Sequence, residues 1–483
     1  MNLTNKKVAL FKASVTSSMP IRPGAVQCVR NCSWCILKRD HSDQGKESED
    51  MICIKSFDNL NLRKSLWFSK YQSFQYHAGQ IDVLKMALQD SSPHIYTIFS
   101  LNPRDIDYLN QVLLHNQIQT TSRMSGSILG RIEDCSLKVN SKPIAILIRP
   151  QSCSGGDTFH EDDSDPWSSP SGLASIFGQI IEQMLKNSTN PCVVPVTVSR
   201  DHDRLELYGL GSICVQILEP YSLRDYIKDK DETTVARHLV QHLYYDTSRN
   251  VAILPTHLIA YLLLYLEREN GPEFEDLVYY IDYFRKSSIE TGIQLAFTGS
   301  SIYVAKYALA LLKDFILIEN DKFYRPRDYD KLVEYACFVT PITAYYGLIS
   351  RSLLMATNGA LNEANTVISS RIIMKISKEE VMATAQLLAE RLELSILCRR
   401  PCNTIEAAIE DTFNQMQMFG KYFRIEEPAV NKNKSSGWIA ELDFDDDLAR
   451  PESRGLKTWI TLCDRANRLD RLNLFMNSVV AHL

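Results

Sequence analysis

The segment HIYTIFSLNPRDIDYL, residues 94–109, joins a short apolar run to a polar turn and a second apolar pattern. Residues 94–100 are rich in β-branched and aromatic side chains, which predicts a strand. The preceding segment HAGQIDVLKMALQD, residues 77–90, has helical periodicity. The region therefore predicts a helix, a strand, a loop and a helix, in that order.

Further apolar runs follow this segment. PIAILIRP (143–150) and PCVVPVTVS (191–199) have the short, continuously apolar character of strands that are buried on both faces. GLASIFGQIIEQMLKN (172–187) between them predicts an amphipathic helix, and SICVQILEPYSL (212–223) closes the series. Strands that alternate with helices over residues 70–225 predict an α/β domain with a mainly parallel sheet.

The chain divides into three predicted parts. Residues 1–68 are a polar N-terminal segment with several cysteines, 69–225 are the α/β domain, and 226–483 are a largely helical C-terminal domain with a flexible loop at 430–450. Helices are predicted in the C-terminal part, together with a hairpin at 315–326; the helical segments are 232–245, 254–267, 302–313, 331–356 and 378–393.

Composition excludes several classes of protein. With 483 residues, 45% hydrophobic and 23% charged, the chain is long and apolar enough for a sizeable core. The formal net charge of -5 comes without a long basic block, so no nucleic-acid partner is expected. The 12 cysteines are irregularly spaced and no apolar signal stretch follows a basic start, which argues against secretion and a disulfide framework.

No run reaches the 18 or so apolar residues of a membrane span. The nearest, VAILPTHLIAYLLLYLE (251–267), contains Pro255, Thr256 and His257. We expect a buried core helix there, with His257 as a satisfied core histidine, and keep contact with a membrane surface as the alternative.

The stretch SLNPRDIDYL (100–109) resembles the first catalytic motif of glycerol-3-phosphate acyltransferases of the mitochondrial type, which share their architecture with dihydroxyacetone-phosphate acyltransferases. The helix before that motif is matched at His77, Gly79 and Gln80. The other similar segments occur in the family's order and cover most of the chain: RPGAVQCVRNCSWC (22–35), VVPVTVSRD (193–201), VQILEPYSLRDYI (215–227), YYDTSRNVAILPTHLIAYLLLYLE (244–267), FTGSSIYVAKYALALL (297–312) and NRLDRLNLFMNSVV (467–480).

The resemblance implies a reaction in which the hydroxyl of glycerol-3-phosphate attacks an acyl-CoA thioester to give lysophosphatidate. In the family a His takes the hydroxyl proton, and an Asp beyond it orients the ring. The aligned positions here are Asn102 and Asp107. An amide has no protonation equilibrium near neutral pH, so Asn102 cannot act as that base.

The substrate-binding motifs also depart from the family. Its third motif has a Glu-Gly pair and two arginines that hold phosphate; the aligned residues are Ile148, Arg149, Gln151 and Cys153. In its second motif, aligned at LGRIEDCSL (129–137), Cys135 and Ser136 replace paired arginines. The fourth motif, with Pro195, is retained. The joint loss of the base, the phosphate-binding arginines and the Glu-Gly pair predicts a protein that keeps the family's fold but does not catalyse its reaction.

We therefore expect a catalytically inactive homologue that acts as a binding or regulatory partner in glycerolipid metabolism, with no cofactor. Acyl-CoA or a lipid, an active acyltransferase paralogue and peripheral membrane contact are the expected partners. By resemblance the location is the cytosolic face of the mitochondrial outer membrane; the C-terminal AHL leaves the peroxisome open, and the cytoplasm is a further alternative. The main alternative function is retained acyl transfer with a displaced base such as His94.

A second alternative comes from CVRNCSWC, which sets Cys28, Cys32 and Cys35 at C-x3-C-x2-C spacing. Three thiolates on a tight loop can hold three irons of a 4Fe-4S cluster. This spacing is typical of radical-SAM enzymes, which place the loop just after a strand and follow it with repeated βα units. The residues that flank CVRNCSWC show neither feature. Zinc binding with His41 as a fourth ligand and unliganded cysteines remain open.

Overall fold

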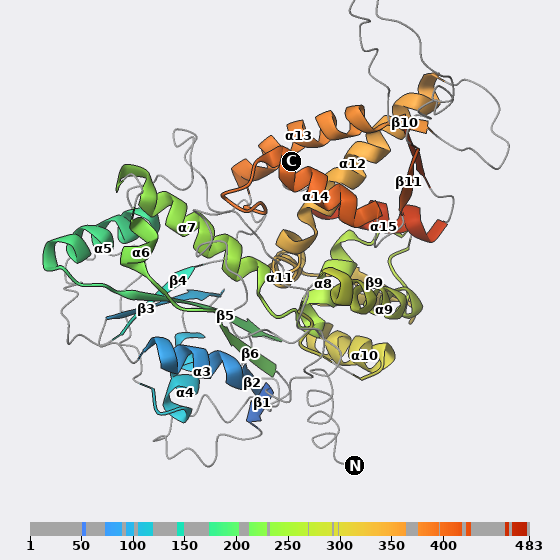
Figure 1. The fold of residues 1–483 in the computed structure, drawn as a ribbon. Coiled ribbons are helices and arrows are strands. Elements are labelled where there is room, and N and C mark those ends of the chain that lie inside the picture. Colours follow the sequence, from blue (N-terminus) through green and yellow to red (C-terminus); the bar gives the residue numbers. More distant parts are fainter. Residues whose placement is uncertain are drawn as a thin grey trace, which may run out of the picture.

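The computed structural model describes residues 51–54, 73–88, 93–100, 105–118, 143–148, 173–201, 212–228, 232–268, 270–291, 294–297, 299–363, 375–395, 397–417, 422–426, 459–462 and 466–480. Figure 1 shows a sheet with helices on both faces, and beside it a largely helical region. This arrangement confirms the predicted fold class.

Seven strands form the main sheet: β1 (Met51–Ile54), β2 (Ser73–His77), β3 (His94–Phe99), β4 (Ile144–Ile148), β5 (Cys192–Arg200), β6 (Ser212–Ile217) and β7 (Tyr221–Ser222). Their order is β1-β2-β6-β5-β3-β4, with β7 paired to β5. The pairs β3–β4, β3–β5 and β2–β6 are parallel. The predicted mainly parallel sheet is thus present.

The apolar run at 212–223 does not extend the parallel series, because β6 pairs with β5 in antiparallel orientation. A parallel neighbour needs a crossover of about a dozen residues or more, usually a helix. The segment between Arg200 and Ser212 is too short for such a crossover, so β6 pairs with β5 in the antiparallel direction.

Strand β3 is buried on both faces, as its sequence predicts. Ile95 and Phe99 belong to one core and Tyr96 and Ile98 to another, because successive side chains of a strand point to opposite faces. The first core is covered by α5 (Leu173–Asn187) and α7 (Glu232–Arg249), with the short α6 (Leu223–Ile227); the second is covered by α3 (Ala78–Ala87) and α4 (Asp105–His115) (Figure 1).

The helical region is built on α8, which is almost wholly buried as predicted. A hairpin of β8 and β9 confirms the one expected at 315–326. The elements of this region are α8 (Pro255–Tyr265), α9 (Phe274–Thr291), α10 (Ser301–Leu312), β8 (Ile316–Glu319), β9 (Phe323–Pro326), α11 (Tyr329–Ala336), α12 (Thr340–Glu363), β10 (Lys375–Ser377), α13 (Lys378–Ser395), α14 (Ile405–Gln415), β11 (Phe423–Glu426), β12 (Trp459–Leu462) and α15 (Ala466–Val480).

The prediction of a single helix over 331–356 is wrong. The chain forms α11 and α12 instead, bent by 96° at the break between them. Pro341 lies in the first turn of α12, where a missing N–H costs nothing; inside a continuous helix its ring would clash with the carbonyl of Cys337. Among the described helices, none alone has the length and apolarity of a membrane span, and α11 with α12 reaches them only as this bent pair.

Candidate functional site

The carboxyl ends of β3 and its neighbours meet where the first motif begins. Phe99 pairs with Ile148 of β4 and with Thr197 of β5, and the Ser100 N–H donates to the carbonyl oxygen of Ile148 at 3.0 Å. Strand β5 continues beyond Thr197 to Arg200. Ligands of α/β sheets bind at the carboxyl ends of parallel strands, so this edge, which we call the carboxyl edge, is the candidate site.

Ser100, Asp105 and Arg200 form a buried polar cluster at the carboxyl edge. The Ser100 hydroxyl donates to Oδ2 of Asp105, and Nη1 of Arg200 lies 3.4 Å from Oδ1 of the same carboxylate. The side chains of Arg200 and Asp105 are only 8% and 1% exposed. A carboxylate at this depth requires a countercharge and hydrogen bonds, and the guanidinium of Arg200 supplies that countercharge to Asp105.

Asp107, the predicted relic of the catalytic pair, lies in the first turn of α4 and is half-buried. Acidic side chains at this position interact favourably with the positive end of the helix dipole. Asn102, its predicted partner, lies outside the described residues, so the pairing of the two stays a prediction.

Three described imidazoles lie away from Asp107. His94 is the first residue of β3, about 17 Å of extended chain from its carboxyl end. His115 is the last residue of α4, about 12 Å along the helix from Asp107. His242 lies on α7, which covers the opposite face of the sheet from α4. The placement of His94 contradicts the expectation that it serves as a displaced base.

His257 approaches the carboxyl edge from α8, with both ring nitrogens engaged. Nε2 lies 3.2 Å from the carbonyl oxygen of Arg200, and Nδ1 lies 3.4 Å from the N–H of Leu254. The N–H can only donate, so Nδ1 accepts and Nε2 carries the proton. Burial lowers the pKa of His257 to about 3, which keeps the ring neutral. This confirms the prediction of a satisfied core histidine.

Asp201 fastens the end of β5 to the helical region. Its Oδ2 accepts from the Tyr307 hydroxyl of α10 at 2.8 Å and from the Ser212 N–H at 3.1 Å, and its Oδ1 accepts from the Thr256 hydroxyl at 3.3 Å. Burial raises the pKa of Asp201 to about 6, while these donors act in the opposite direction. The carboxylate therefore has a structural role between sheet and helices.

The other described site predictions, Ile148 and Pro195, are sheet residues. Ile148 ends β4 and is buried. Pro195 pairs with Thr97, and its carbonyl oxygen accepts from the Leu218 N–H at 2.8 Å. Their assignment to relic motifs stays a prediction. The remaining predicted residues lie outside the described part of the chain: Arg149, Gln151 and Cys153 of the third motif, and Cys28, Cys32 and Cys35. Within the described part, His, Cys, Asp and Glu form no group of three or more that could hold a metal ion.

Sequence reasoning missed the roles of Arg200, Asp201 and Tyr307. A signal for the first two is present, because an Arg-Asp pair directly follows a continuously apolar strand and its charges need buried partners. Nothing in the sequence marks Tyr307 as the partner of a residue more than a hundred positions earlier.

No family model matches the chain. Mitochondrial glycerol-3-phosphate acyltransferase 1 of Bos taurus is 24% identical to it over 245 residues, which cover 47% of this chain and 27% of the relative. The Sus scrofa protein is 25% identical over 236 residues (45% and 26%), and the Homo sapiens protein is 24% identical over 238 residues (45% and 26%). The match thus spans about a quarter of these relatives' length. By sequence, the chain is distantly and partially similar to mitochondrial glycerol-3-phosphate acyltransferase 1.

Proposed function

We propose that this chain is a homologue of glycerolipid acyltransferases that does not transfer acyl groups and acts as a binding or regulatory partner in glycerolipid metabolism. The distant similarity to glycerol-3-phosphate acyltransferase 1 supports the family, and the helix-covered sheet is compatible with it.

The ion pair between Arg200 and Asp105 is the observation that carries the proposal of inactivity. Acyl transfer to glycerol-3-phosphate needs cations for a dianionic phosphate and a base for the hydroxyl. Arg200 lies at the carboxyl edge, but its charge is neutralised by a buried carboxylate at 3.4 Å. The imidazole of His257, which donates a hydrogen bond to the carbonyl oxygen of Arg200, has its other nitrogen engaged by the N–H of Leu254.

The motif residue Asn102 supports the same conclusion. A positioned general base contributes about 10²- to 10⁴-fold to such reactions, and an amide cannot supply that contribution. Asp105 does not substitute for it, because its carboxylate already accepts from Ser100 and faces Arg200. We propose acyl-CoA or a lipid, and an active acyltransferase paralogue, as partners; the mitochondrial relatives favour the outer mitochondrial surface.

Retained acyl transfer is the second candidate function. His202 directly follows Asp201, the first residue after β5, and lies outside the described residues. It is the histidine nearest in sequence to Arg200 and Asp201, so it replaces His94 as the residue to test.

The experiment is an assay of the purified chain with radiolabelled palmitoyl-CoA and glycerol-3-phosphate, with an active mitochondrial glycerol-3-phosphate acyltransferase as positive control. We expect no lysophosphatidate from the native chain or from Asn102→His, because restoring the imidazole does not restore the phosphate-binding cations. Turnover by the native chain that is lost in Asp107→Ala or His202→Ala would overturn the proposal.

The regulatory part needs its own measurement. Adding increasing amounts of the chain to the active acyltransferase in lipid vesicles should change the rate of lysophosphatidate formation in a saturable way. A rate that stays constant over all molar ratios would contradict a regulatory role.

A further inference from the structure

A cavity of about 240 Å³ lies between α7 and the helical region, lined by residues of α7, α12, the segment 397–404 and α14. None of its lining residues comes from the main sheet or from α3 and α4, the helices that cover the second core. Three of the lining side chains are arginines, Arg249, Arg399 and Arg400, and one is acidic, Asp411. The cavity is therefore a candidate site for an anion.

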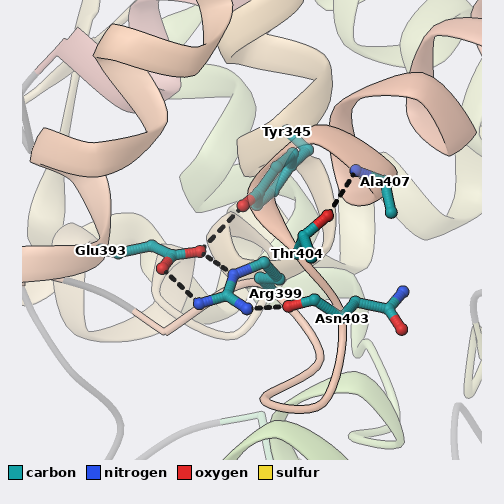
Figure 2. A network of polar contacts seen from close by, with 6 residues as sticks. All are labelled: Tyr345, Glu393, Arg399, Asn403, Thr404 and Ala407. Atoms are coloured by element: carbon teal, nitrogen blue, oxygen red, sulfur yellow. Dashed lines mark hydrogen bonds and ion pairs between the residues drawn. The ribbon is translucent and has the colours of Figure 1, made fainter. Parts of the chain in front are cut away.

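Arg399 is held in place by three hydrogen bonds to two residues (Figure 2). Its Nε and Nη2 donate to the two carboxylate oxygens of Glu393 at 2.6 and 2.8 Å, and its Nη1 donates to the carbonyl oxygen of Asn403. Glu393 also accepts from the Tyr345 hydroxyl at 2.9 Å, and Thr404 caps α14 through the Ala407 N–H at 3.2 Å. This network fixes the backbone on both sides of Arg400.

Arg249 and Arg400 keep donors for a ligand. Nη1 of Arg249 donates to the carbonyl oxygens of Pro341 and Ile342 at 3.3 and 3.1 Å, which orients the guanidinium and leaves its other nitrogens without an acceptor in the described part of the chain. The side chain of Arg400 makes no hydrogen bond or ion pair with the described residues, although it is partly buried against the cavity. A guanidinium with N–H donors left over can hold the oxygens of a phosphate by paired hydrogen bonds.

The local charge remains positive. The three arginines face two carboxylates, Glu393 and Asp411, which leaves one net positive charge. Glu393 is taken up by Arg399, and Asp411 is exposed, where water and salt screen it. The charge of Arg400 is therefore uncompensated at short range.

We infer that this cavity binds a small phosphate-bearing anion: phosphate, pyrophosphate or a phosphomonoester with a short substituent. The volume of about 240 Å³ is below the roughly 300–1,000 Å³ of pockets for drug-sized ligands, which favours a small anion over a nucleotide or an intact acyl-CoA. Arg249 and Arg400 contact the anion, and Arg399 is a positioning residue. The inference does not depend on the proposed function, because the site is separate from the carboxyl edge.

The test is calorimetric titration of the full chain with inorganic phosphate and with pyrophosphate at constant ionic strength. We expect saturable binding of at least one of them, weakened about tenfold or more by Arg400→Gln, because a charge-assisted hydrogen bond contributes about that factor. Arg400→Lys should retain part of the affinity. Arg391→Gln is the matched control, since Arg391 is exposed on α13 nearby, carries the same charge and does not line the cavity.

Thermal unfolding without phosphate checks that Arg400→Gln is folded, and Arg249→Gln provides a second weakened variant. Absence of saturable binding of both probes by the native chain would overturn the inference. Binding that Arg400→Gln leaves unchanged would overturn it as well, since the anion would then bind elsewhere, for example at the carboxyl edge.

Discussion

The hydroxyl of Tyr307 donates to Oδ2 of Asp201 at 2.8 Å, and this hydrogen bond joins α10 of the helical region to the end of β5. Asp201 is fully buried and also holds Thr256 at the start of α8. One carboxylate thus connects the strand that ends at the carboxyl edge with two helices of the other region. Its ionisation should affect how well the two parts hold together.

The stability of the protein should carry a pH-dependent contribution from Asp201. Burial raises its folded-state pKa to about 6 from the ordinary value of 3.8, so between these values the folded state holds a proton that the unfolded state has released. The free energy of unfolding therefore falls as pH rises through this window, by about 1.4 kcal/mol per unit and on the order of 3 kcal/mol in total. Above pH 7 this contribution is constant.

The variant Asp201→Asn isolates this contribution, because an amide keeps an acceptor oxygen and has no charge to bury. Denaturant unfolding of both proteins from pH 5 to pH 8 should show the native chain losing stability relative to the variant up to about pH 6.5 and then a constant difference. A difference that is independent of pH across this range would show that Asp201 does not titrate there.

Tyr307→Phe should lower the free energy of unfolding by about 1.5–3 kcal/mol at pH 7.5, because it removes a hydrogen bond to a buried, charged acceptor. Tyr303→Phe on the same helix is the control, since its hydroxyl makes no hydrogen bond with the described residues. We expect that control to change stability by less than about 0.5 kcal/mol. Equal effects in the two variants would argue that the Asp201 contact contributes nothing specific.

The sequence predicts most of the sheet core, because burial of a strand on both faces leaves a direct trace in its residues. Strand β3 is rich in apolar and aromatic side chains, and the structure places Ile95 and Phe99 in one core and Tyr96 and Ile98 in the other. Whether a neighbouring strand runs parallel or antiparallel is harder to predict. The direction of β6 depends on the length of its connection to β5, not on its own apolar residues.

The polar cluster at the carboxyl edge was only partly predictable. Asp107 and Asn102 could be located by their similarity to a motif, but the partner of Asp105, at the start of α4, is Arg200, at the end of β5. Such a contact depends on how α4 packs against the end of β5, which local sequence patterns do not encode. The break before Pro341 could have been predicted from the rule that proline is tolerated only in the first turn.

Gly347 should not tolerate a methyl group, although alanine is the better helix former by about 1 kcal/mol. A Cβ at Gly347 would lie 2.7 Å from Cγ1 of Val479, on the face where α12 packs against α15. We expect Gly347→Ala to destabilise the protein by about 1–3 kcal/mol. Gly178 on α5 is the control: its added Cβ would meet nothing closer than 3.9 Å, so Gly178→Ala should stabilise by about 0.5–1 kcal/mol in the same denaturant experiment.

The buried pair of Asp105 and Arg200 should show strong coupling in a double-mutant cycle. Asp105→Asn or Arg200→Gln alone leaves an uncompensated charge at a site where both side chains are less than a tenth exposed, so each should cost about 3–5 kcal/mol. The double variant should cost much less than the sum of the two. The exposed pair of Lys186 and Glu182 on α5 is the control, with 69% and 64% exposure and no measurable coupling expected, because water and salt screen it. Additive effects for Asp105 and Arg200 would mean that Arg200 does not neutralise Asp105, and the argument for an inactive carboxyl edge would then fail.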